Sequence, residues 1–205
     1  NLYLLTEESL SAGRSTLEVV KEAVQAGVDV IQLRDKNMSL RERYALGKEI
    51  RRITRENEVC FIVNDRVDLA LALDADGVHL GQDDLPLRDA RRILGQEKII
   101  GVTALKEEEI REAEREGADY LGIGSVYNTS SKKVADHKDG IGLSGVKKIK
   151  KMTKLPITAI GGLNLNNAAE VLRAGADTIS VLSTVTQAED IKSAVEELNY
   201  LIKQE

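Results

Sequence analysis

The 205-residue chain contains one cysteine, two prolines, no tryptophan and only 3% aromatic residues. The single cysteine, Cys60, excludes an internal disulfide, and its apolar neighbours predict a core residue rather than a nucleophile. Because aromatics are scarce, the core must rest on Val, Ile, Leu and Ala. No apolar run approaches the ~20 residues of a membrane span, and no signal-peptide pattern opens the chain. We therefore expect a cytoplasmic protein with no membrane partner.

The rest of the composition is ordinary for a globular protein, with 42% hydrophobic and 31% charged residues. The length suits one sizeable core, so residues 1–205 are expected to form a single domain. The net charge of -5 gives no overall attraction to nucleic acid, and no nucleic-acid partner is expected. Any site for phosphorylated ligands must therefore be positive only locally.

Short apolar runs alternate with helical patterns along the whole chain. Strands are expected at residues 2–6, 28–31, 60–63, 77–80, 98–102, 120–124, 156–160 and 178–182. Helices are expected at residues 14–26, 39–57, 67–73, 87–94, 107–116, 143–152, 164–174 and 190–202. This alternation predicts an α/β protein, a single (βα)8 TIM barrel with a closed parallel sheet. An open doubly wound sheet is the alternative.

An internal repeat supports this count of units. Asp29, Asp76, Asp119 and Asp177 each follow an Ala- or Gly-containing helix end and open an even-numbered strand. The last interval is lengthened by a polar connection at residues 125–142. Coincidence at Ala- and Gly-rich helix ends is the alternative, and four occurrences in phase with the strands disfavour it.

Polar and cationic residues follow the second expected strand. Gln32, Arg34 and Lys36 alternate with Leu33 and Asp35, so on an extended backbone the first three point the same way. Two cations and an amide at a strand end suit a multiply charged phosphate. A solvated loop with incidental charges is the alternative.

In a parallel barrel the carboxyl ends of all strands share one face, where active sites lie. Asp65 and the neighbouring pair Asp83 and Asp84 follow two adjacent strands. Asp65 with one of that pair offers the one or two carboxylates that Mg²⁺ takes alongside waters and phosphate oxygens. A cap on the following helix is the alternative role for Asp65. His79 and His137 have no companions at zinc spacing, and His79 is expected to line the barrel.

Further polar groups occur at the remaining strand ends. Gly161 and Gly162 end the seventh strand and Ser183 follows the eighth, where barrel loops commonly bind phosphate through backbone N–H groups. Tight packing alone is the alternative explanation of the glycines. The other strand-end residues are Asn64, Arg66, Gln82, Thr103, Thr129, Ser130, Ser131 and Lys132. Together they suggest two phosphorylated small molecules, one of them a diphosphate.

These motifs, in this order, resemble the thiamine phosphate synthase family. The resemblance rests on residues 2–6, 32–36, 64–66, 77–84, 101–103, 122–124, 159–162 and 174–177. It implies a (βα)8-barrel transferase of thiamine biosynthesis. Such an enzyme joins a hydroxymethylpyrimidine diphosphate to a thiazole phosphate, or its carboxylate, and releases pyrophosphate with Mg²⁺ as cofactor.

The resemblance also implies roles for particular residues. The pyrimidine diphosphate would be bound by Gln32, Leu33, Arg34, Asp35, Lys36, Asn64, Thr103 and Lys132, among which Arg34, Lys36, Thr103 and Lys132 would be catalytic. The thiazole phosphate would be bound by Thr129, Ser130, Ser131, Gly162, Leu182 and Ser183. Asp65 and Asp84 would hold Mg²⁺. The chain departs from the family's usual Thr-Pro-Thr-Lys at residues 129–132 and its usual Ser at Thr103, but the hydroxyl groups are kept.

The expected mechanism is dissociative: the diphosphate leaves, the aminopyrimidine stabilises a cation, and the thiazole nitrogen attacks it. The rivals are a related thiazole tautomerase, a non-catalytic barrel that binds phosphorylated ligands, and another phosphosugar enzyme. The sequence leaves the oligomeric state open, and a homo-oligomer is compatible with it.

Overall fold

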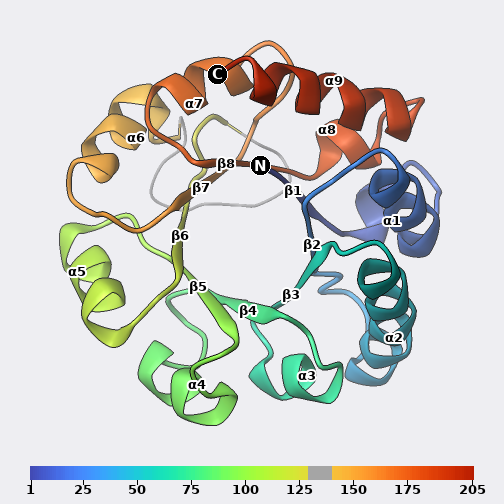
Figure 1. The fold of residues 1–205 in the computed structure, drawn as a ribbon, viewed down its shortest axis with the longest axis horizontal. Helices are drawn as coiled ribbons and strands as arrows, with labels where there is room; N and C mark the ends of the chain where they lie inside the picture. Colours follow the sequence, from blue (N-terminus) through green and yellow to red (C-terminus); the bar gives the residue numbers. More distant parts are fainter. Residues whose placement is uncertain (129–139) are drawn as a thin grey trace.

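Eight parallel strands close into a barrel that is surrounded by helices (Figure 1). The computed structural model describes residues 1–128 and 140–205. The strands are β1 (Leu2–Leu5), β2 (Val30–Leu33), β3 (Cys60–Asn64), β4 (Gly77–Leu80), β5 (Ile99–Thr103), β6 (Tyr120–Ile123), β7 (Ile157–Ile160) and β8 (Thr178–Val181). They follow one another around the barrel, and β1 pairs with β8. The predicted closed barrel is confirmed, and the open sheet is excluded.

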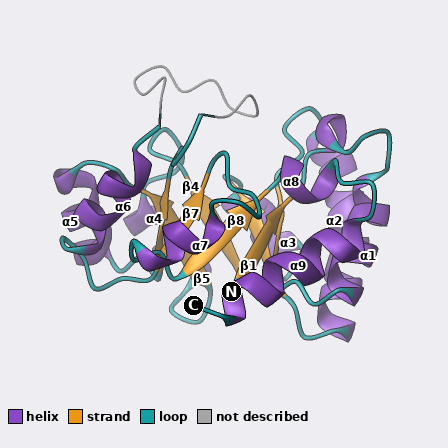
Figure 2. Ribbon diagram, turned by 90° about the horizontal axis from the view of Figure 1, so that it is seen from above, coloured by secondary structure: helices purple, strands orange, loops and turns teal. Residues whose placement is uncertain are grey.

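The helices cover the outside of the barrel (Figures 1 and 2). They are η1 (Glu8–Leu10), α1 (Thr16–Gln25), α2 (Leu40–Glu56), α3 (Val67–Ala72), α4 (Leu87–Leu94), α5 (Glu107–Glu116), α6 (Gly142–Lys150), α7 (Ala168–Arg173), α8 (Ser183–Thr186) and α9 (Ile191–Lys203). The chain ends N and C lie together at one end of the barrel, where β1 begins (Figure 2). Within the described ranges, no helix combines the length and apolarity needed to cross a bilayer.

Two of the boundary differences from the sequence prediction move polar residues, and two short helices were not predicted. The β2 strand begins at Val30 and runs to Leu33, so Gln32 lies within the strand rather than beyond it. The α7 helix begins at Ala168, because Asn164 and Asn167 form a local turn in which the Asn167 side chain accepts from the Asn164 N–H at 2.8 Å. The short helices η1 and α8 were not predicted, since three or four residues carry no helical periodicity.

The core has two parts, one on each side of the strands. Aliphatic residues fill the layer between the barrel and its helices, as the scarcity of aromatics requires. A smaller cluster inside the barrel includes Tyr3, Leu5, Ile62, Tyr120 and Leu182. Cys60 packs against this inner cluster, and burial raises the pKa of its thiol to about 12. A thiol in that state is protonated at neutral pH, which agrees with the predicted structural role.

The four repeated aspartates share one function at the start of the even strands. Each carboxylate accepts a hydrogen bond from a backbone N–H at the beginning of the preceding odd strand. The donor–acceptor pairs are Leu2–Asp29 (2.7 Å), Phe61–Asp76 (2.7 Å), Ile100–Asp119 (2.7 Å) and Ile157–Asp177 (2.8 Å). These N–H groups lie at the strand entrances, where an unpaired donor would be costly. The sequence repeat therefore marks a repeated structural unit of two strands.

Cations reinforce three of these four aspartates. The ion pairs are Arg51–Asp76 (2.9 Å), Arg91–Asp119 (2.7 Å) and Lys150–Asp177 (2.8 Å). Each cation comes from the helix that leads into the odd strand of the unit. The ion pairs lie at the N-terminal end of the strands, the end that stabilises a barrel rather than the end that carries its chemistry.

Removal of one such aspartate should destabilise the protein measurably. We expect Asp76→Ala to lower the free energy of unfolding by about 2–3 kcal/mol, because the Phe61 N–H and the Arg51 guanidinium lose their acceptor. The control is Glu56→Ala, which breaks an exposed helical pair with Arg52 and should cost far less stability. Urea unfolding of the two variants checks this, and equal losses would contradict the structural role of the repeat.

Candidate active site

Within β2, the predicted alternation is seen for Gln32 and Leu33, which point to opposite sides of the sheet. Gln32 points into the barrel, where its Nε2 donates to the Tyr3 hydroxyl at 2.6 Å. Leu33 is buried on the opposite side, in the core between the barrel and the helices. A ligand in the barrel mouth can therefore meet Leu33 only through its backbone.

Arg34 is held in place by a buried acid that the sequence analysis did not single out. Its Nη1 lies 2.7 Å from Oε2 of Glu7, whose side chain is 7% exposed. The other oxygen of Glu7 accepts from the Asn37 amide at 3.1 Å. Glu7 lies two residues beyond the end of β1, so the segment after one strand positions the cation that follows the next strand. A guanidinium fixed in this way is prepared for an anion without the cost of ordering a long side chain.

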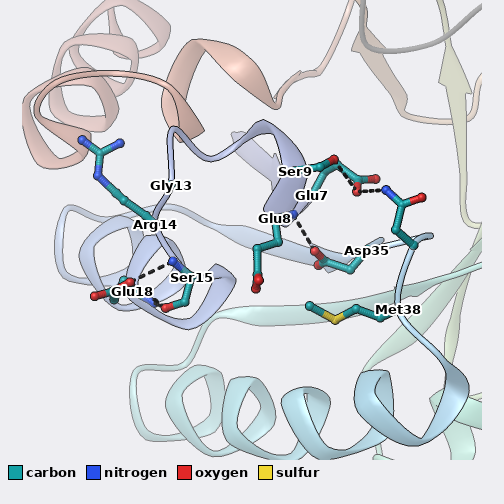
Figure 3. A pocket seen from close by; sticks show the side chains of 10 residues that line it. Glu7, Glu8, Ser9, Gly13, Arg14, Ser15, Glu18, Asp35 and Met38 are labelled. Atoms are coloured by element: carbon teal, nitrogen blue, oxygen red, sulfur yellow. Dashed lines mark hydrogen bonds between the residues drawn. The ribbon is translucent and has the colours of Figure 1, made fainter.

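Asp35 is committed to structural contacts. Its carboxylate accepts from the Thr6 hydroxyl, from the Glu8 N–H at 2.7 Å and from the Thr16 hydroxyl at 3.0 Å. Figure 3 shows it beneath η1, with the Glu8 contact dashed. These bonds join the ends of β1 and β2 to the first turn of α1. The Asp35 side chain therefore supports the site by holding these elements together.

Lys36, Asp65 and Asp84 form a compact charged group across the ends of β2, β3 and β4. The Lys36 Nζ lies 2.8 Å from Oδ2 of Asp65. Asp84 accepts from the Gly81 N–H at 2.7 Å. Burial raises the pKa of Asp84, and the neighbouring Asp65 carboxyl raises it further. A carboxyl whose ionisation is opposed by burial and by a neighbouring acid, as that of Asp84 is, belongs to a site that favours an added cation.

The backbone at Asp65 supports a role other than helix capping. Asp65 has a φ of 63°, in the left-handed region that residues with a side chain seldom occupy. Its N–H donates to the His79 carbonyl at 2.8 Å, which ties it to β4. The N-cap of α3 is Arg66, and it makes no side-chain capping bond. The capping alternative for Asp65 is therefore excluded.

Thr103 and Asn64 lie at the ends of β5 and β3. Asn64 is 7% exposed and pairs in register with His79. The Thr103 hydroxyl is 2.9 Å from His79 Nε2. The Thr103 backbone carbonyl accepts a hydrogen bond from Gln82 Nε2 at 2.5 Å. Both residues thus lie at the barrel mouth, next to the carboxylate pair in strand order.

The glycine pair after β7 is required by close packing. Gly161 and Gly162 have φ values of 101° and 68°. A Cβ on Gly162 would lie 2.8 Å from the Tyr127 Cβ, and one on Gly161 would lie 2.0 Å from the Ser125 Oγ. Tight packing therefore does require glycine at both positions, as the packing alternative stated. It does not exclude phosphate binding, because a backbone without a Cβ is also open to close approach by a ligand.

Beyond β8, Leu182 is buried in the inner cluster and Ser183 opens α8. The first N–H groups of a helix have no acceptor within it. The β7 and β8 strands are neighbours, so these groups lie beside the glycine pair. The predicted residues Thr129, Ser130, Ser131 and Lys132 lie outside the described residues.

A cavity of about 610 Å³ lies between η1, the start of α1 and the segment that follows β2 (Figure 3). Its lining includes Glu7, Glu8, Glu18 and Asp35. Such an acidic lining disfavours a diphosphate, and among the predicted site residues only Asp35 borders the cavity. Apart from Asp35, the predicted phosphate-binding residues within the described part of the chain lie at the strand ends and not around this cavity.

The family model described as Thiamine monophosphate synthase matches residues 2–185. The chain belongs to the thiamine monophosphate synthase family. It is similar to the thiamine-phosphate synthase of Haloarcula marismortui, with 48% identity over 205 residues that cover 100% of this chain and 97% of the relative. The corresponding protein of Moorella thermoacetica is 48% identical over 202 residues, covering 98% of this chain and 95% of the relative.

A solved structure gives the same result. The thiamine phosphate pyrophosphorylase from Pyrococcus furiosus is 46% identical, with a TM-score of 0.90 and coverage of 100% of this chain and 96% of that one. The resemblance inferred from the motifs is confirmed. As a member of the thiamine monophosphate synthase family, the chain is a transferase of thiamine biosynthesis.

The residues present fit a magnesium ion in this family member. No cluster of three His, Cys, Asp or Glu side chains suited to a metal occurs in residues 1–128 and 140–205. A pair of carboxylates is nevertheless what Mg²⁺ uses when water and substrate phosphate complete its shell. Asp65 and Asp84 form such a pair, and Asp83 is exposed beside them.

Sequence reasoning missed two features of this family site. Glu7 gave no signal of its own, although its position shortly after β1 placed it among the strand ends. The tyrosines Tyr3 and Tyr120 lie inside the barrel and bond to each other at 3.1 Å. Their inward direction could have been read from their alternation with buried leucines on β1 and β6, but their mutual contact could not.

Proposed function

We propose that the chain is a Mg²⁺-dependent thiamine phosphate synthase. It couples 4-amino-5-hydroxymethyl-2-methylpyrimidine diphosphate to thiazole phosphate, or its carboxylate, and releases pyrophosphate. The observation that carries this proposal is the group of Arg34, Lys36, Asp65 and Asp84 on adjacent strand ends. It combines fixed cations with a carboxylate pair, which is the set required to bind and neutralise a diphosphate.

Asp65 and Asp84 would hold Mg²⁺, which supplies positive charge to a leaving diphosphate. Lys36 is half-exposed beside Asp65, so it can turn toward the ligand while the carboxylates remain in place. Arg34, fixed by Glu7, offers its remaining N–H groups to the same anion. Lys132, on the sequence prediction, adds a further cation and completes the catalytic group with Thr103.

The pyrimidine would be oriented by Gln32 and Asn64. The Gln32 Oε1 is buried and has no hydrogen-bond partner among the described residues. An unpaired buried acceptor costs about 1–3 kcal/mol, and a substrate amino group would remove that cost. At the opposite side of the mouth, Gly162, Leu182 and Ser183 would meet the thiazole phosphate, together with Thr129, Ser130 and Ser131.

The chemistry proposed here needs no protein nucleophile. After the diphosphate departs, the aminopyrimidine carries the positive charge, and the thiazole nitrogen attacks its exocyclic carbon. The protein positions the two reactants and stabilises charge. This dissociative route accords with the protonated, partly buried state of Cys60.

The tautomerase alternative requires a base, and His79 is the residue placed to act as one. Both of its ring nitrogens are already hydrogen-bonded, Nδ1 to Tyr120 at 3.0 Å and Nε2 to Thr103 at 2.9 Å. A ring engaged on both sides is poorly placed to accept a substrate proton. We also propose that residues 1–205 act as one catalytic domain in the cytoplasm, with small molecules as partners. A homo-oligomer stays compatible with this proposal.

Pyrophosphate release tests the proposal directly. We expect release when the protein is mixed with pyrimidine diphosphate, thiazole phosphate and Mg²⁺, and none when any of the three is omitted. Thiamine phosphate should appear in equal amount. Binding of both ligands without release would refute the synthase and favour the non-catalytic barrel, and thiazole isomerisation would favour the tautomerase.

A further inference from the structure

A chain of hydrogen bonds crosses the interior of the barrel. It starts at Gln32 on β2, passes through Tyr3, Tyr120 and His79, and ends at Thr103 on β5. The successive distances are 2.6 Å for Gln32 Nε2 to Tyr3 OH, 3.1 Å for Tyr3 OH to Tyr120 OH, 3.0 Å for Tyr120 OH to His79 Nδ1, and 2.9 Å for His79 Nε2 to Thr103 Oγ1. These hydrogen bonds thus connect Gln32 and Thr103, which were predicted separately to meet the pyrimidine diphosphate.

The barrel is shaped around these rings. A Cβ on Gly101 would lie 2.0 Å from the Tyr120 ring, and one on Gly122 would lie 2.6 Å from the His79 ring. The two rings stack with centroids 5.5 Å apart and an interplanar angle of 27°. A side chain at either glycine would push the neighbouring ring away and break its hydrogen bonds. The glycines on β5 and β6 therefore create the space in which His79 and Tyr120 are held.

Donor and acceptor rules give the chain a direction. The Gln32 Nε2 can only donate, so the Tyr3 oxygen accepts from it and the single Tyr3 proton goes to Tyr120. The Tyr120 proton then goes to His79 Nδ1. A neutral imidazole that accepts at Nδ1 carries its proton on Nε2, and that proton is donated to the Thr103 oxygen.

Burial keeps the two phenols in the form that this direction requires. Tyr3 is 4% exposed and Tyr120 is 9% exposed. Burial raises the pKa of both hydroxyls, so each keeps its proton at neutral pH. Thr103, by contrast, is half-buried at the mouth, where its hydroxyl proton can reach a ligand.

We infer that Tyr3, Tyr120 and His79 are positioning residues that turn the Thr103 hydroxyl into an obligatory donor toward the barrel mouth. Because Thr103 already accepts from His79, its own proton is directed outward. A donor at that place suits an anionic oxygen of the pyrimidine diphosphate, and this part of the inference rests on the proposed function. His79 acts through Thr103 and touches no reacting atom itself.

The opposite amide orientation of Gln32 would reverse every donor in the chain. His79 would then carry its proton on Nδ1, and Thr103 would donate inward to Nε2. The two arrangements therefore differ in one measurable property, the tautomer of His79. The protein contains only two histidines, so the signals of His79 are simple to assign.

The first test needs neither substrate nor catalysis. Two-bond ¹H–¹⁵N correlation spectra of ¹⁵N-histidine-labelled, ligand-free protein report which ring nitrogen carries the proton, and His137→Gln assigns the signals. We expect the neutral Nε2–H tautomer for His79, and a changed Nδ1 signal in Tyr120→Phe. The Nδ1–H tautomer, or an Nδ1 signal unaffected by Tyr120→Phe, would overturn the inference.

The second test asks whether His79 acts through Thr103. His79→Leu and Thr103→Val should each lower kcat/KM for the pyrimidine diphosphate about tenfold, since each removes one hydrogen bond in a water-poor site. The double variant should be no worse than Thr103→Val alone. His79→Gln, whose amide N–H can replace Nε2–H, should recover most of the loss. Additive losses in the double variant would refute the positioning role.

The two failures can be told apart. An inactive wild-type protein with the Nε2–H tautomer would refute the proposed synthase and leave the bond direction intact. An active protein with the Nδ1–H tautomer would support the proposed synthase and refute the inferred direction of the hydrogen bonds. Tyr200→Phe removes a hydroxyl from a residue that is 71% exposed and should leave both the spectrum and kcat/KM unchanged.

Discussion

Arg34→Met should lower kcat/KM for pyrophosphate release by about 100–1,000-fold, because it removes a fixed guanidinium from a developing diphosphate charge. It should also lower the free energy of unfolding by about 3–5 kcal/mol, because Glu7 is left as a buried carboxylate without its cation. Steady-state kinetics and urea unfolding measure the two effects.

A double variant separates these two effects. Glu7→Gln combined with Arg34→Met removes the stranded charge, so most of the stability should return while activity stays low. Arg111→Met is the matched control, since its pair with Glu107 is exposed to solvent and its loss should leave stability nearly unchanged. If the double variant regained activity together with stability, the catalytic role of Arg34 would be wrong and its role would be purely structural.

Asp65→Asn and Asp84→Asn should each lower turnover at least about 100-fold. On the proposed function, Mg²⁺ should raise the Tm of the wild-type protein, and each of these variants should abolish that rise. Asp83→Asn should retain both, because Asp83 is exposed beside the pair. Kinetics and thermal unfolding with and without Mg²⁺ test this set. A large effect of Asp83→Asn with little effect of Asp84→Asn would reassign the second ligand.

The raised pKa of Asp84 gives this prediction a pH dependence. A carboxyl whose pKa is higher in the folded than in the unfolded state stabilises the protein at low pH, and the benefit is lost as the pH rises through the folded-state value. As the pH rises from the unfolded-state pKa of Asp84 through its folded-state pKa, the metal-free wild type should therefore lose stability relative to Asp84→Asn. At neutral pH the metal-free Asp84→Asn variant should have the higher Tm.

Much of this protein could be predicted from local pattern. The alternation of apolar runs and helical periods is local, because each strand and helix must bury its own apolar face. The repeated aspartates are local too, since each caps the entrance of one two-strand unit. The charged residues of the mouth were predictable once the barrel was, because its topology places every strand end on one face.

The partners of those charged residues were decided only by the tertiary structure. Nothing near Arg34 in the sequence indicates that Glu7, across a neighbouring strand end, would hold it, or that Asp35 would turn away to bind Thr16. Such pairs depend on strand register, and a parallel barrel brings together residues with no fixed spacing in the chain.

The interior hydrogen-bond chain shows the same limit most clearly. Tyr3 and Tyr120 are separated by 117 positions, yet their hydroxyls meet because β1 and β6 face each other across a closed barrel. The sequence by itself determined the fold, the family and the polar residues of the mouth. The closure of the sheet decided which of them touch, because contact across a barrel depends on its radius and stagger rather than on any local pattern.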